Sequence, residues 1–109
     1  MHKSLKDIVK GTTYNGAEFS ITVNGQPLDL TGTTIKMDLK QFKTAETALV
    51  FSTIDGTITL GAPGVFYIAP RVIDIPAGEY RFDIRFLFLD GTIKTYCSGT
   101  WKVLQNVTD

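Results

Sequence analysis

Apolar and polar residues alternate most regularly between positions 80 and 88. The apolar positions are Tyr80, Phe82, Ile84, Phe86 and Phe88, with Arg81, Asp83 and Arg85 between them. Successive side chains of a strand point to opposite faces, so this pattern predicts a strand with one buried face. Asp90-Gly91 follows, and this dipeptide is typical of a two-residue type I′ turn, in which both residues take a positive φ. The pattern therefore predicts a hairpin whose second strand runs to Val103.

A two-residue turn fixes the register of that hairpin. It places Phe88 opposite Ile93, Phe86 opposite Thr95, Ile84 opposite Cys97, Phe82 opposite Gly99, and Tyr80 opposite Trp101. Cys97 is then a small buried apolar residue, and Gly99 leaves room for an aromatic ring. Trp101 and Tyr80 form an aromatic cross-strand pair. The opposite face is polar and is expected to meet water or a partner; there Arg81, Asp83 and Arg85 lie opposite Thr100, Ser98 and Tyr96.

Turn signals divide the rest of the chain into short segments rich in β-branched and aromatic residues. Strands are expected around 19–23, 28–30, 35–39, 49–51, 58–60, 65–68 and 73–75. The best helical candidate, 41–48, is short and is expected to be a loop or a single turn. Closely spaced short strands predict an all-β fold, an immunoglobulin-like β-sandwich of seven to eight antiparallel strands. A small β-barrel is the alternative.

The 109 residues fit one domain, 1–109, in which 1–13 is either an N-terminal arm or the first strand. The Lys and Arg residues number 11, as do the Asp and Glu residues, so the formal net charge is zero. A nucleic-acid partner is not expected, because binding phosphates favours a basic excess. No apolar run is long enough to span a membrane, and 1–10 lacks a signal peptide, so folding in a cytoplasm is expected.

Few residues have the chemistry of an active site. The single histidine, His2, stands beside the initiating Met1 and is expected to be inert. The single cysteine, Cys97, excludes an intrachain disulfide and is expected to be a packing residue. No carboxylate pair is marked out by an apolar setting, and several Asp residues are expected to cap turns. The sequence therefore predicts no enzyme, with no catalytic, cofactor-binding or metal-binding residue and no cofactor.

Aromatic residues outside the hairpin core raise a second hypothesis, a carbohydrate-binding β-sandwich module. The candidates for outward-facing aromatics are Tyr14, Phe42, Phe66 or Tyr67, and Tyr96. Such side chains can form a platform for a sugar ring. Packing in the core or at a subunit contact is the favoured interpretation, since single surface aromatics need no function.

Several phrases of the sequence together resemble a known group of proteins. They are 7–12 (DIVKGT), 23–32 (VNGQPLDLTG), 35–37 (IKM), 75–80 (IPAGEY), 90–96 (DGTIKTY) and 99–103 (GTWKV). The chain resembles small immunoglobulin-like structural proteins of phage and prophage virions. It is similar to the N-terminal domain of siphophage upper-baseplate proteins.

The resemblance implies a virion location and a non-enzymatic structural role in the tail, baseplate or capsid, through protein–protein assembly. It implies other virion structural proteins as partners and a homo-oligomer in the assembled particle. The chain ends at Asp109 without a fibre-like or coiled-coil extension. We therefore expect a small stand-alone subunit rather than an adaptor between two assemblies.

Overall fold

The computed structural model describes residues 2–41 and 46–105 and is all-β over that part of the chain. Its thirteen strands are β1 His2–Ser4, β2 Ile8–Val9, β3 Thr13–Tyr14, β4 Ala17–Ser20, β5 Thr22–Val23, β6 Gln26–Pro27, β7 Thr34–Gln41, β8 Thr47–Ser52, β9 Ile58–Leu60, β10 Val65–Ile68, β11 Arg71–Val72, β12 Gly78–Leu87 and β13 Ile93–Leu104. Many of them are only two to four residues long, because turns interrupt the chain so often. In the described ranges, no helix is long and apolar enough to cross a membrane.

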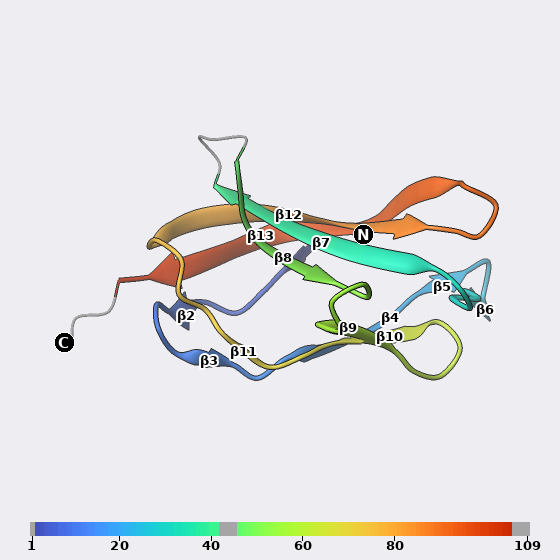
Figure 1. The fold of residues 1–109 in the computed structure, drawn as a ribbon, viewed down its shortest axis with the longest axis horizontal. Helices are drawn as coiled ribbons and strands as arrows, with labels where there is room; N and C mark the ends of the chain where they lie inside the picture. Colours follow the sequence, from blue (N-terminus) through green and yellow to red (C-terminus); the bar gives the residue numbers. More distant parts are fainter. Residues whose placement is uncertain (1, 42–45, 106–109) are drawn as a thin grey trace.

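The largest sheet, called the main sheet below, has the order β1-β13-β12-β7-β8, with β2 also paired to β13. The long hairpin β12–β13 lies at its centre, and β7 and β8 continue it on one side (Figure 1). On the other side β1 and β2 run parallel to β13. An all-antiparallel arrangement was expected, so that part of the prediction is wrong. The N-terminal segment pairs with the last strand of its own chain.

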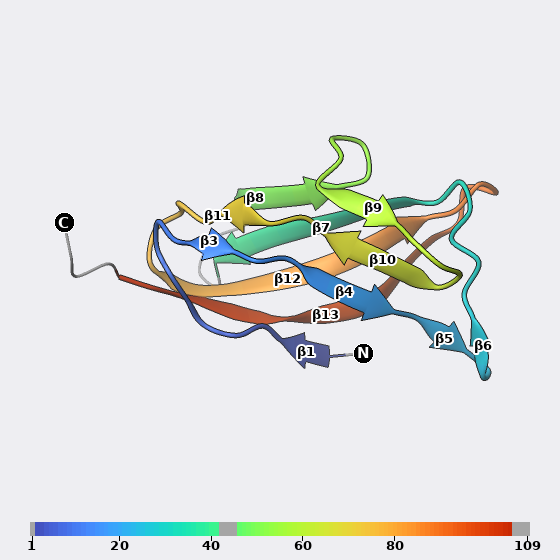
Figure 2. The same ribbon diagram turned by 90° about the horizontal axis from the view of Figure 1, so that it is seen from below.

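Three smaller sheets complete the fold: β4-β10-β9, β3-β11 and β5-β6. The first two lie below the main sheet in Figure 1 and form the near layer in Figure 2. Buried side chains of the main sheet and of the smaller sheets share a single core. The chain thus buries two layers of strands against each other, as an apolar sheet face requires.

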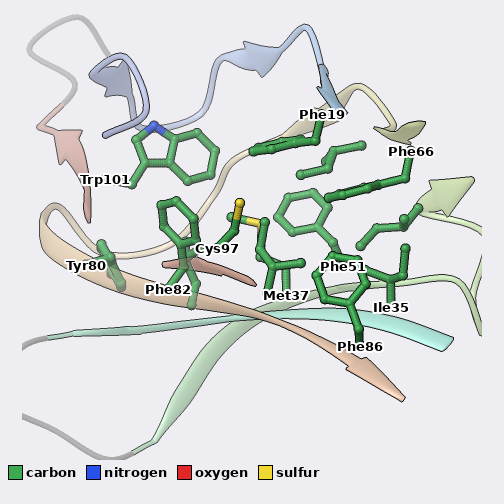
Figure 3. Packing of buried hydrophobic residues seen from close by; sticks show 14 of the residues in the cluster. Phe19, Ile35, Met37, Phe51, Phe66, Tyr80, Phe82, Phe86, Cys97 and Trp101 are labelled. Carbon is green, nitrogen blue, oxygen red and sulfur yellow. The ribbon is translucent and has the colours of Figure 1, made fainter. Parts of the chain in front are cut away.

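The core follows the predicted alternation. Along β12, Tyr80, Phe82, Ile84 and Phe86 are at most 2% exposed. Figure 3 shows Cys97 and Met37 near the middle of the core, with Trp101 toward one end. At the other end Phe19 stacks on Phe66 at a centroid distance of 5.0 Å. Large rings from both layers therefore fill the space between them.

The predicted hairpin register is confirmed at Tyr80–Trp101, Phe82–Gly99 and Ile84–Cys97. It is wrong nearer the turn, where Phe86 lies opposite Lys94 and Leu87 opposite Ile93. The loop holds three residues, because Gly91 N–H donates to the Phe88 carbonyl and Phe88 N–H donates to the Thr92 carbonyl.

The predicted type I′ turn is also wrong. Gly91 has a φ of 89°, and Asp90 is not among the residues with positive φ. A turn followed by a left-handed glycine is the usual three-residue hairpin. The three-residue loop shifts the register of the hairpin by one residue relative to the prediction. A β-bulge between Ile84 and Arg85 then restores the predicted register.

Some expected strands differ from the structure. In place of 73–75 the strand is β11, and Ile73 instead exchanges hydrogen bonds with Gly11 and Thr12. Residues 28–30 form no strand, although Leu30 is buried. The helical candidate 41–48 lies partly outside the described residues; Gln41 ends β7 and Thr47 begins β8.

Candidate interaction surface

The two residues considered first for chemistry lie on the main sheet. His2 belongs to β1, where its backbone pairs with Ser98. Cys97 is 1% exposed and lies opposite Ile84, as the sequence predicts. A thiol so placed is shielded from reagents. It does not have the electropositive, partly open surroundings that reactive cysteines need.

Three aspartates cap turns, as the sequence predicts for this residue type. In each case a threonine two residues later donates its backbone N–H to the carboxylate: Thr31 to Asp29, Thr57 to Asp55 and Thr92 to Asp90. Hydrogen bonds from these threonines hold the pKa of all three carboxyls below its ordinary value. Among the described residues, no three His, Cys, Asp or Glu side chains form a group that could hold a metal ion.

The candidate aromatic residues do not gather on one face. Phe66 is buried, whereas Tyr67 is 39% exposed. Tyr14 packs edge-on against Trp101, with ring centroids 4.9 Å apart. Tyr96 was predicted on the polar face, but the bulge turns it onto Phe86, and that prediction is wrong. Phe42 lies outside the described residues.

The outer face of the main sheet, turned away from the core, carries an ordered set of charges. The outward residues of β12 are Glu79, Arg81, Asp83, Arg85 and Leu87, and those of β7 include Lys36, Asp38 and Lys40. The pairing of β12 with β7 sets Arg81 opposite Lys40, Asp83 opposite Asp38, and Arg85 opposite Lys36. Each charge thus lies opposite a charge of the same sign, and together they form three rows across the two strands. We call these charged rows the first cationic row, the anionic row and the second cationic row.

Like charges directly opposite each other are unfavourable, and contacts between the anionic row and the second cationic row compensate for this repulsion. The Arg85 guanidinium donates to Asp38 at 2.8 Å, and Lys36 Nζ lies 3.9 Å from the other oxygen of Asp38. The Asp38 side chain is only 13% exposed. The structure records no ion pair for Arg81, Lys40 or Asp83 with any other described residue. Over the described residues, these three charges therefore lie on the outer face without an ion-pair partner.

The charged rows surround a shallow hollow of about 140 Å³. It is lined by Asp38, Lys40, Arg81, Phe82, Asp83 and Arg85. The hollow is smaller than the pockets that hold drug-sized ligands, whose volumes are typically about 300–1,000 Å³. The surface has the form of a contoured face for contact rather than a deep pocket.

An apolar patch lies beyond the second cationic row. Leu87 and Ile93 form a cross-strand pair and are 43% and 64% exposed. At the tip of the hairpin, Leu89 is 80% exposed and covers Gly32, where an added Cβ would approach the leucine side chain to 2.8 Å. Exposed aliphatic groups beside ordered charges are typical of a surface that contacts another protein.

The sequence prediction found the polar face of β12 but missed the charged rows. A signal was available: residues 36–40 (KMDLK) and 81–85 (RFDIR) share one pattern of cation, apolar, anion, apolar, cation. The two segments are far apart in the sequence, and only their pairing in register brings like charges together. No family profile, curated protein or solved structure matches the chain.

Proposed function

We propose that the protein is a non-enzymatic structural subunit of a phage or prophage virion, an immunoglobulin-like β-sandwich that works by protein–protein assembly. The observation that carries the assembly role is the set of charged rows on the outer face of the main sheet. Ordered potentials of alternating sign serve recognition, because they select both a partner and its register. The virion setting rests on the resemblance of the sequence phrases described above.

Strand order supports the immunoglobulin-like assignment. The run β13-β12-β7-β8 corresponds to the G, F, C and C′ strands of a variable-type domain. The sheet β4-β10-β9 corresponds to strands B, E and D. The two sheets contribute to one core, as the two halves of a sandwich do.

A hydrogen bond near the start of β12 gives independent support. The Tyr80 hydroxyl donates to the Pro76 carbonyl at 2.5 Å. A tyrosine early in strand F that bonds the backbone a few residues upstream is the tyrosine corner of immunoglobulin-like domains. Here the hydrogen bond lies in the segment that leads from β11, in a smaller sheet, into β12 of the main sheet.

Purified particles test the function. An antibody against the chain should detect it in virions isolated by density gradient from the lysed source strain, at a fixed number of copies per particle. The variant Asp83→Lys, produced in place of the original chain, should lower its incorporation, because it alters the anionic row. Glu18→Lys makes the same change in charge on β4 and should leave incorporation unchanged. A chain that never accompanies particles contradicts the proposal.

A further inference from the structure

We propose that the outer face of the main sheet binds the same face of a second copy about a two-fold axis that runs across the strands. This inference rests on the proposed assembly function and names its partner. Homo-oligomers most often form two-fold dimers, whose interface must be complementary to itself. Of an axis along the strands and an axis across them, only the axis across the strands makes the charged rows complementary to themselves.

The direction of the axis decides which rows meet. In a face-to-face dimer, an axis along the strands places every row over the same row of the second copy, so cations meet cations. An axis across the strands reverses the order of the rows. With the axis between Arg81 and Asp83, the first cationic row of each copy faces the anionic row of the other. Arg81 then meets the second copy's Asp83, and Lys40 meets its Asp38.

The neighbouring rows agree with the same axis. Glu79, at the start of β12, meets the second copy's Arg85. Leu87, from the apolar patch, meets its Ala77 at the Pro76–Ala77 corner, where Pro76 is exposed. Cation meets anion and apolar meets apolar along β12. The Arg81–Asp83 contacts lie nearest the axis, where two twisted sheets stay closest together.

Net charge does not oppose the dimer. The 11 cationic and 11 anionic side chains balance, so two copies carry no overall repulsion. The attraction comes from ordered local charges and is sensitive to screening. Self-association of the intact chain should therefore weaken as sodium chloride is raised through physiological ionic strength, where the Debye length is about 8 Å.

Paired charge reversals provide the test, with sedimentation equilibrium as the measurement. Arg81→Glu sets two carboxylates against each other across the axis, and Asp83→Lys sets two cations against each other. Each variant alone should self-associate about tenfold more weakly or worse, since opposed like charges are costly. An equimolar mixture of the two should form a heterodimer, because one contact then sets the introduced glutamate against the introduced lysine and the other keeps the original Asp83–Arg81 pair.

Glu18→Lys is the matched control. It carries the same change in net charge as Asp83→Lys but lies on β4, in the other layer. It should self-associate like the original chain, and mixing it with Arg81→Glu should not draw that second variant into heterodimers as Asp83→Lys does. Circular dichroism and thermal unfolding should show that all three variants remain folded, because the substituted residues are exposed.

The result that overturns the inference is a chain that stays monomeric at all concentrations, or reversals that do not rescue each other. Either result leaves the proposed function open to its own test, because the chain could still enter particles through a different protein. Absence from particles together with a rescued heterodimer would instead contradict the virion role and support the dimer.

Discussion

The removal of one hydroxyl group from Tyr80 tests the packing of the fold most sharply. Tyr80 is fully buried, and its hydroxyl donates to the Pro76 carbonyl at the start of β12. Burial raises the pKa of this hydroxyl, so it stays neutral and remains a donor at ordinary pH. Tyr80→Phe keeps the ring and removes the donor, leaving the shape of the core unchanged.

Tyr14 provides a matched comparison. Its hydroxyl is buried without a hydrogen-bond partner in the described structure, and burial raises its pKa. A net hydrogen bond contributes about 0.5–1.5 kcal/mol, so Tyr80→Phe should lower the free energy of unfolding by about 1 kcal/mol. Tyr14→Phe removes a polar atom that has already lost its water. It should leave the free energy of unfolding unchanged or raise it by up to about 1 kcal/mol.

Urea unfolding followed by fluorescence provides the assay. Trp101 is the only tryptophan, is 1% exposed, and donates its Nε1–H to the Lys6 carbonyl at 2.8 Å, so its emission reports unfolding. Both variants should keep the slope of the transition, because the surface exposed on unfolding is the same. The two midpoints should move apart. The reasoning is refuted if Tyr14→Phe destabilises the protein as much as Tyr80→Phe does.

Three further predictions address the pH dependence, the thiol and the core. The free energy of unfolding should fall as pH drops below about 4, the ordinary aspartate range, because depressed carboxyl pKa values stabilise the fold only while the groups stay ionised. Replacing Asp29, Asp55 and Asp90 by Asn should flatten that fall in acid titrations followed by fluorescence. Cys97 should react with a thiol reagent only as fast as the protein unfolds, and rapid labelling of the native chain would contradict its burial. Phe86→Ala should cost about 3–5 kcal/mol in chemical denaturation, because Phe86 packs edge-on against Phe66 and Tyr96; a cost below 1 kcal/mol would place Phe86 outside the core.

Local alternation predicted the hairpin and its buried face because the period of a strand is imposed by the nearest residues. The same reasoning placed Cys97 opposite Ile84, although it assumed the wrong turn. The three-residue loop and the bulge shift the register in opposite directions, so the two errors cancel beyond Cys97. The sequence does not show a bulge, because Tyr96 fits the alternation as well as its neighbours do.

Long-range pairing was not predictable in the same way. The outward positions of β7 and β12 can be identified from alternation alone, but their register depends on how the whole sheet is assembled. The parallel docking of β1 and β2 on β13 depends on the path of the N-terminal segment. The charged rows exist only once these contacts have formed.

A lysine footprint tests most directly the claim that the outer face of the main sheet is the assembly surface. The protein should be acetylated at low concentration and again where it associates, and the modified lysines should be quantified by mass spectrometry. Lys40, in the first cationic row, should become protected on association, whereas Lys6 and Lys94 should remain equally reactive in both states. Association that protects Lys94 and leaves Lys40 reactive would contradict the account.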